Sequence, residues 1–220
     1  MYMLAWDGSR WSEPEFQRTI TGFVDTETDE MVLFSCQNSI LLPEGNLFVV
    51  GCDTGEGGDI WATSRSISDA NDWFPPPSLW ENHSPVTESS NPISSPEVIA
   101  DSEGKFHALW LQAESAAQVP SSSSSITELF YSGFDGSDWS RPVKILSSPN
   151  GGIDQPSLAI DQQDRLLLVW REKQSGTIYF SWANSDSASN PKEWTNPVAI
   201  PALQPLASYP SIQVKSSGII

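Results

Sequence analysis

Basic residues are scarce in this chain of 220 residues: 11 Lys and Arg stand against 28 Asp and Glu, and the formal net charge is −17. Neutralising nucleic-acid phosphates requires clustered Lys and Arg, so the composition argues against a nucleic-acid partner and, by the same charge, against an anionic membrane surface. No apolar run approaches the ~20 residues that span a bilayer. The N-terminus lacks a charged start followed by an apolar stretch, so we expect no signal peptide in this chain.

Cysteine and histidine are equally scarce, with two residues of each. Cys36 precedes a predicted first strand and Cys52 ends the second, so the turn between the strands brings the two nearly opposite each other. Two states stay open: a cross-strand disulfide, which implies an oxidising compartment, and a pair of buried free thiols. The disulfide would favour an extracellular or cell-surface location. His83 and His107 are too far apart in the sequence pattern to share a metal ion.

Tryptophan, by contrast, is abundant: ten residues within 38% hydrophobic ones supply the apolar area for one domain with a sizeable core. Between residues 154 and 201, polar residues, Gly or Pro separate four apolar runs of strand length, at 157–160, 166–170, 178–182 and 197–200. Four such strands make one small antiparallel sheet, which is not stable alone. The unit is therefore expected to recur.

The unit does recur along the chain. A Trp followed three residues later by Pro stands at Trp11, Trp73, Trp139 and Trp194, 55 to 66 residues apart. Prolines at 96, 156 and 210 mark the predicted starts of first strands with a similar period. A repeating four-stranded unit of this length, with a Trp in each copy, is typical of a β-propeller blade. Tryptophans at repeating positions, such as Trp110 and Trp170, are expected to pack between blades rather than to stack on a ligand.

The predicted fold is an all-β propeller of four-stranded antiparallel blades, in a single domain or fragment that covers residues 1–220. Complete blades are expected at about 31–80, 94–146 and 154–201, with partial blades at 1–16 and 209–220, which amounts to about four blades. Propellers protect their sheet edges by closing the ring. We therefore expect further blades, or another chain, to complete this one.

Two predicted turns carry a related motif, Asp135-Gly136-Ser137-Asp138-Trp139 and Asp7-Gly8-Ser9-Arg10-Trp11. They resemble the Ser-x-Asp-x-Gly-x-x-Trp "Asp box" of the bacterial neuraminidase (BNR) repeats in sialidase-like propellers. Segments 66–73 and 185–194 keep a Ser, an Asp and the Trp of this motif without its Gly. The resemblance implies that these turns lie on one face and that ligands bind at the opposite, channel-side face. The loops expected there are 53–59, 111–127 and 171–176, and, between blades, 19–30, 82–95 and 147–155.

Sialidases clamp their substrate with three arginines and use a Tyr–Glu pair and an Asp in catalysis, and this set is incomplete here. Only one arginine is placed on the channel side, and the Arg-Ile-Pro segment that usually carries the family's first arginine is not found in these 220 residues. Other glycoside hydrolysis needs two carboxyl groups across one bond. The candidate catalytic residues on that side are Asp53, Asp154, Arg171 and Glu172, with Glu56 beside them. The alternative is that these carboxylates are solvated loop charges.

Two acidic loops offer the closely spaced oxygen ligands that Ca²⁺ prefers. The candidate ligands are Asp25, Glu27 and Asp29 in the first loop and Asp53, Glu56 and Asp59 in the second. Neither loop has the spacing of a helix-loop-helix calcium site. No other cofactor is expected.

The favoured function is non-catalytic recognition of a glycan or a protein by the channel-side loops, because the repeat is clear while the catalytic set is incomplete. Two alternatives stay open. One is a glycoside hydrolase of the exo-sialidase type whose catalytic residues lie partly outside this chain. The other is a structural scaffold.

Overall fold

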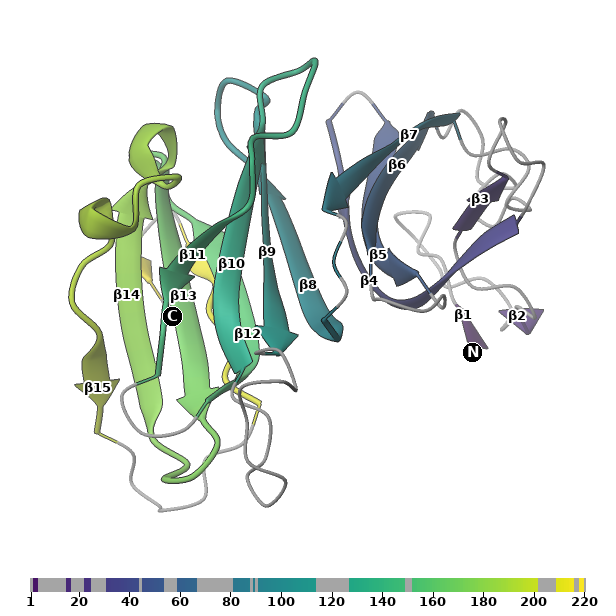
Figure 1. Cartoon of the computed structure of the whole chain (residues 1–220). Helices are drawn as coiled ribbons and strands as arrows, with labels where there is room; N and C mark the ends of the chain where they lie inside the picture. Colours follow the sequence, from purple (N-terminus) through teal and green to yellow (C-terminus); the bar gives the residue numbers. More distant parts are fainter. Residues whose placement is uncertain are drawn as a thin grey trace.

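The computed structural model describes residues 31–43, 45–53, 59–66, 81–87, 89, 91–113, 127–148, 152–201, 209–215 and 218–219, together with short strands at 2–3, 15–16 and 22–24. This part of the chain is nearly all β-strand (Figure 1), with two 3₁₀ helices, η3 (Ser185–Ser187) and η4 (Pro191–Glu193). Its helices are too short to cross a membrane.

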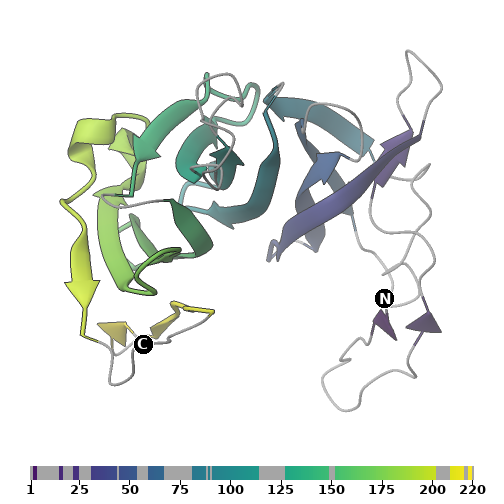
Figure 2. The same ribbon diagram turned by 60° about the horizontal axis from the view of Figure 1, so that its bottom comes forward.

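Two four-stranded antiparallel sheets form the best-packed region. The middle sheet consists of β8 (Ile93–Ala100), β9 (Phe106–Ala113), β10 (Thr127–Phe134) and β11 (Val143–Leu146). The third sheet consists of β12 (Ile153–Ile160), β13 (Arg165–Glu172), β14 (Ile178–Asn184) and β15 (Val198–Ile200). In both, strand order follows the chain, so each first strand has one free edge. Figure 2 shows the sheets following one another in an arc.

The first sheet has five strands: β3 (Gly22–Val24), β4 (Met31–Leu41), β5 (Asn46–Asp53), β6 (Ile60–Ser66) and β7 (Glu81–Thr87). β3 and β7 fall in segments 19–30 and 82–95, which the sequence predicted as loops, so that prediction was wrong. β7 has no apolar run, and pairing with β6 imposes its extended form. Pro85 is compatible with it because β7 is an edge strand.

Short antiparallel pairs lie near both chain ends. β1 (Tyr2–Met3) pairs with β2 (Glu15–Phe16), and β16 (Val214–Lys215) pairs with β17 (Gly218–Ile219). Ile212, just before β16, packs against Leu167 and Val169 on the face of the third sheet. The segment before β16 therefore packs against the third sheet, in the same way as β12 packs against the strands of the middle sheet.

Pro96 and Pro156 do not open the first strands as predicted but stand inside β8 and β12, at β-bulges, whereas Pro210 lies before β16. The registers of β8 and β12 shift between Ser94 and Glu97 and between Asp154 and Ser157. In each bulge the residue before the proline has a positive φ, 52° at Ser95 and 50° at Gln155. A bulge residue needs no ladder hydrogen bond, so the missing N–H of proline costs nothing there.

Tryptophans fill the space between sheets, as the repeat predicted. Trp110 and Trp170 occupy the same register position in β9 and β13, and both are 0% exposed. Trp139 packs with Phe48 and Phe134 between the first and middle sheets. Burying aromatic rings in this way stabilises the stack of sheets, because each sheet alone leaves one apolar face in water.

The first sheet has no tryptophan at the corresponding position. Its residue at the position of Trp110 and Trp170 is Gly51, and the ring of Phe34 fills the space above it. A Cβ at Gly51 would lie 2.2 Å from that ring. Glycine is required here by the close approach of Phe34.

Candidate functional site

Each four-stranded sheet has two ends that differ in their connections. At the turn end lie the connections from first to second and from third to fourth strands. Both 3₁₀ helices belong to the third-to-fourth connection of the third sheet, at the upper left of Figure 1. At the loop end lie the second-to-third connections and those between sheets, including residues 147–148, 152 and 173–177. Asp154, Arg171 and Glu172 lie at the loop end, and the 135–139 turn lies at the turn end.

Asp154 and Arg171 form an ion pair at the loop end of the third sheet. They are cross-strand neighbours, and Arg171 Nη2 lies 2.6 Å from Asp154 Oδ2, with side chains 26% and 28% exposed. The corresponding pairs are Ser94 with Leu111 in the middle sheet and Cys36 with Cys52 in the first. Of the first, middle and third sheets, only the third therefore has a charged donor and acceptor at this position.

Glu172 points the other way from Arg171 and is 0% exposed, because successive residues of a strand face opposite sides. Its carboxylate accepts hydrogen bonds from the hydroxyls of Ser148 at 2.7 Å and Ser175 at 2.5 Å. These bonds join the connection before β12 to the turn after β13. Glu172 thus connects the segment before Asp154 to the turn after Arg171 through hydrogen bonds.

The disulfide partners and Asp53 belong to the loop end of the first sheet. Cys36 lies inside β4, opposite Cys52 in β5, and a disulfide joins them with their Cα atoms 5.1 Å apart. The backbone N–H of Asp53 donates to the carbonyl of Asp59, and Asp59 Oδ1 accepts from the N–H of Ser89 at 2.8 Å. Asp59 therefore ties this loop to the connection towards the middle sheet.

The remaining calcium candidates, Asp25, Glu27, Asp29 and Glu56, lie outside the described residues. Within the described ranges, no three His, Cys, Asp or Glu side chains come together in a group that could hold a metal ion. Calcium binding by these loops stays a prediction.

The middle sheet has a polar cluster of its own at the loop end. Glu128, 8% exposed, accepts from Lys144 Nζ at 3.0 Å and from the hydroxyl of Ser147 at 3.1 Å. Its cross-strand neighbour Gln112 donates to the hydroxyl of Ser89 at 3.0 Å. Side-chain hydrogen bonds thus join the loop end of the middle sheet to the connections on either side of it.

Glu97 is the residue that sequence reasoning missed. It lies on the first strand β8, and burial raises its pKa to about 7 although the backbone of Leu158 on β12 hydrogen-bonds to its carboxyl group. Its counterpart Ser157 in the third sheet accepts from the N–H of Ile212 at 3.3 Å. Each side chain thus hydrogen-bonds to the backbone of the segment that follows its own sheet: β12 for Glu97 and the residues before β16 for Ser157. The signal was present in the sequence: Glu follows Pro96, where Ser follows Pro156 and Pro210.

Comparison with solved structures identifies the class of fold. The chain is similar to an α-L-arabinanase from Penicillium chrysogenum, solved with arabinobiose, at a TM-score of 0.58 and 15% identity over 99% of this chain and 60% of that one. It is also similar to an endo-arabinase from Bacteroides thetaiotaomicron, at a TM-score of 0.54 and 13% identity over 94% and 74% of the two chains. A third similar structure is an α-L-arabinofuranosidase from Lactobacillus brevis, with a TM-score of 0.53 and 12% identity over 95% of this chain and 67% of that one.

These neighbours are β-propeller glycosidases, and at such identities the likeness shows the fold alone. The chain spans about 60% of the arabinanase that it matches. No protein-family model matches the sequence, and no curated protein matches it. The propeller architecture is therefore supported, while no match points to the sialidase type of repeat in particular.

Proposed function

We propose that this chain is part of a propeller that recognises a glycan at the loop end of its sheets, with Asp154 and Arg171 as contacts. The ion pair between them carries the proposal. It places a planar set of N–H donors beside carboxylate acceptors on rigid strands, partly open to solvent. Neighbouring sugar hydroxyls both donate and accept, so they match such a pair.

The charge of this end favours a neutral glycan over an acidic one. Arg171 is already compensated by Asp154, so the pair has no net positive charge to offer a sialic acid carboxylate. The net charge of −17 opposes anionic ligands further. The arabinan-active neighbours fit the same expectation, since the arabinanase was solved with arabinobiose, an uncharged sugar.

We also propose that the sheets are repeats of the sialidase type; this part of the proposal concerns the structure of the repeat and not a sialidase activity. Its support comes from the 135–139 turn. Asp135 Oδ1 accepts from the N–H and hydroxyl of Ser137 and from the N–H of Asp138, while Gly136 has a φ of 105° and Trp139 packs between sheets. An aspartate that organises a tight turn in front of a packed tryptophan is what the Asp-box resemblance implies.

Binding is tested by calorimetric titration with arabino- and galacto-oligosaccharides, with sialyllactose as the acidic comparison. Asp154→Ala and Arg171→Ala should each weaken the binding of the neutral oligosaccharide at least about tenfold, roughly 1.4 kcal/mol, because each removes one of the two side chains that contact the sugar. Lys192→Ala, exposed in η4 at the turn end, is the matched control and should leave affinity unchanged. Binding that survives both substitutions, or a preference for sialyllactose, would contradict the proposal.

Glu97 favours a second candidate, hydrolysis of a glycosidic bond. A carboxyl group with a pKa of about 7 is partly protonated at neutral pH and can act as a general acid. Hydrolysis also needs a second carboxylate, and Asp154 on the neighbouring first strand is the candidate at the loop end.

Release of nitrophenol from nitrophenyl α-L-arabinofuranoside, and of sugars from arabinan, tests this candidate. Glu97→Gln keeps an acceptor for Leu158 but removes the acid, so any activity should fall at least about 100-fold. Ser157→Ala, which removes the corresponding acceptor without touching a carboxyl group, is the control. Activity that Glu97→Gln leaves intact would exclude this role, and silence in both the binding and hydrolysis assays would favour a scaffold.

A further inference from the structure

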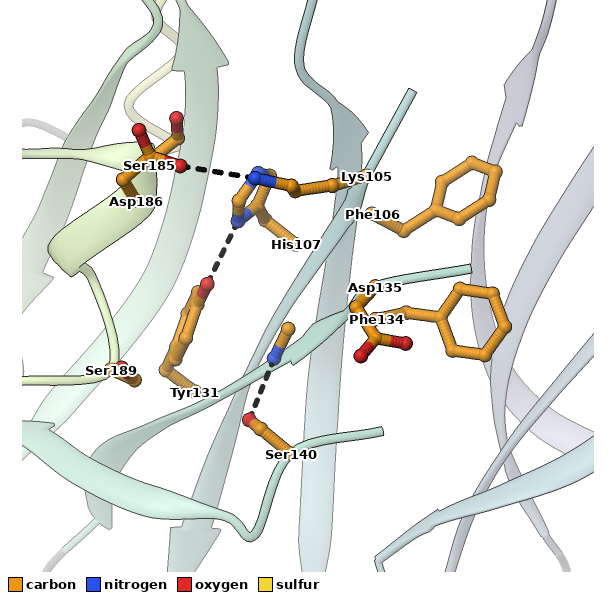
Figure 3. A pocket seen from close by; sticks show the side chains of 11 residues that line it. Lys105, Phe106, His107, Tyr131, Phe134, Asp135, Ser140, Ser185, Asp186 and Ser189 are labelled. Carbon is orange, nitrogen blue, oxygen red and sulfur yellow. Dashed lines mark hydrogen bonds and ion pairs between the residues drawn. The ribbon is translucent and has the colours of Figure 1, made fainter. Parts of the chain in front are cut away.

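A cleft lies at the turn end, at the opposite end of the sheets from Asp154 and Arg171. It opens between the middle sheet and η3, with a volume of about 190 Å³. Figure 3 shows His107 and Tyr131 pointing into it from β9 and β10, with Lys105 and Asp186 at its rim. Gly133 and Asp135 line the side towards the 135–139 turn.

The cleft exists because the middle sheet departs from the repeat at three positions. Register places Gly133 where the third sheet has Trp182, whose ring lies under the guanidinium of Arg165 at 5.1 Å. Glycine leaves that volume open. The same register places His107 and Tyr131 where the third sheet has Leu167 and Phe180, and where the first sheet has Phe48 and Ala62.

This polar pair is not needed to build the sheet, since both neighbouring sheets use apolar residues there. Burying His107 and Tyr131, each 3% exposed, removes their polar groups from water, which is costly unless they are hydrogen-bonded. The pair therefore needs hydrogen-bond partners that the apolar residues of the neighbouring sheets do not need. Such an exception to a repeating pattern indicates a functional requirement.

The hydrogen bonds at the floor of the cleft have a defined direction. Asp101 Oδ2 accepts from His107 Nε2–H at 3.2 Å, because the carboxylate has no proton to give and its Oδ1 already accepts the N–H groups of Glu103 and Lys105. Burial lowers the pKa of His107, so the ring is neutral and its Nδ1 accepts from Tyr131 O–H at 2.8 Å. The lone pairs of the Tyr131 oxygen are left to accept.

Gly133 protects this arrangement. A Cβ at position 133 would lie 2.8 Å from the Tyr131 hydroxyl oxygen, so any side chain there would displace the hydroxyl from His107. One residue thus opens the cleft and keeps its floor acceptor in place.

The rim carries no excess positive charge. Lys105 Nζ lies 2.8 Å from Glu103 and 3.1 Å from Asp186. Hydrogen bonds from Asp138 and Ser137 lower the pKa of Asp135 to about 2, so its carboxylate is an acceptor at any ordinary pH. An anion is disfavoured here, and no cation site of three ligands forms among the described residues.

We propose that the cleft binds a small, uncharged, polyhydroxylated ligand, one sugar ring or a polyol, whose hydroxyl groups donate to Tyr131 and to the rim carboxylates and accept from Lys105. The volume suits one ring, since it is well below the roughly 300–1,000 Å³ of sites for larger ligands. The site is separate from the loop-end site and does not depend on the function proposed there.

Saturation-transfer and chemical-shift titrations with L-arabinose, D-galactose and glycerol test the proposal, with sodium sulfate and calcium chloride as charged probes. At least one neutral probe should bind, with a dissociation constant on the order of 1 mM for so small a ligand. The double variant His107→Leu/Tyr131→Phe gives this sheet the pair found in the third sheet. It should bind the neutral probe at least about tenfold more weakly, and its unfolding midpoint should fall somewhat because Asp101 Oδ2 loses the hydrogen bond from His107.

Two further measurements keep the test decisive. Asp186→Asn, on a side chain that is 78% exposed, cannot disturb the core and should weaken binding about threefold even if the double variant does not fold. Asp154→Ala and Arg171→Ala should leave this binding unchanged, which separates the site from the one at the loop end. The proposal is overturned if no neutral probe binds, if the double variant folds and binds as the wild type does, or if a charged probe binds more tightly than the sugars.

Discussion

The middle and third sheets share one frame and differ at both of its ends. They share the buried tryptophans Trp110 and Trp170 and the bulged first strands. They also share a third-strand serine that donates to a backbone carbonyl: Ser132 to Ser140 at 2.7 Å and Ser181 to Thr195 at 2.7 Å. These shared features all lie within the sheets or at the contacts between them. A change there would leave a cavity in the apolar packing or a buried polar group without a hydrogen bond.

The differences lie where packing makes fewer demands. At the loop end the third sheet has the Asp154–Arg171 ion pair and the middle sheet has Ser94 and Leu111. At the turn end the middle sheet has an open cleft where the third has Trp182. Each sheet can therefore serve as a reference for the other. Where one sheet has a polar or small residue and the other has an apolar or large residue at the same register position, packing alone does not explain the choice.

The largest expected effect concerns the shared tryptophans. Trp110→Ala and Trp170→Ala should each lower the free energy of unfolding by about 3–5 kcal/mol, because each leaves a large cavity between sheets. Urea denaturation followed by circular dichroism measures the loss. A loss below 1 kcal/mol at either site would break the equivalence of the two sheets.

The same positions also distinguish the sheets. Trp110 Nε1 donates to Gln112 Oε1 at 3.4 Å, whereas the buried Nε1 of Trp170 has no hydrogen-bond partner among the described residues. Replacement by Phe should therefore cost less at 170 than at 110, because it removes an unsatisfied donor there.

An intermediate effect is expected at Gly51, which stands in the first sheet where the others have tryptophan. Gly51→Ala should cost about 1–3 kcal/mol by driving a Cβ into the ring of Phe34. In a Phe34→Ala background that cost should disappear. Gly104→Ala is the control: its φ of 81° makes the substitution strained, but nothing lies near its Cβ, so its cost should be the same in both backgrounds. An unchanged cost for Gly51→Ala would show that Phe34 does not occupy the tryptophan position.

The last effect, which is small over any single pH unit, is the pH dependence that separates Glu97 from its counterpart Ser157. Burial raises the pKa of Glu97 from 4.5 to about 7, so folding favours its protonated form. Its contribution to stability is fully present below pH 4.5 and is lost as the pH rises through about 7. Glu97→Gln should therefore become more stable relative to wild type across this window, by at most about 1.4 kcal/mol per pH unit. Ser157→Ala should show no such slope, and a flat difference for Glu97→Gln would mean that its carboxyl group is not desolvated.

Much of the fold could be predicted from the sequence, because the period of the apolar runs and of the tryptophans is a local property. The strands of the middle and third sheets and the burial of Trp110 and Trp170 followed from it. The prediction was wrong where sequence gives little local signal. β7 is polar and is extended only because β6 binds it, and Pro96 and Pro156 mark bulges inside strands rather than strand starts.

The candidate site was predicted only in part. Asp154, Arg171 and Glu172 were placed at one end of the sheets from their positions in the repeat, but their different roles depend on side-chain direction. The burial of Glu97 depends on how β8 and β12 pack against each other. The cleft could not be predicted, because only the strand register shows that Gly133 occupies the position that Trp182 has in the third sheet.

The sequence by itself determined an all-β chain of recurring four-stranded sheets with tryptophans between them, because strand length, turn residues and apolar spacing act over a few neighbouring residues. Tertiary structure alone decided which polar groups meet. The carboxylate of Asp164 reaches Ser102, 62 residues away, and Arg171 lies opposite Asp154 because a bulge between Asp154 and Ser157 shifts the register. Such contacts depend on the offset between strands and on the distance between sheets, and a change of one residue in register moves every side chain to the opposite face.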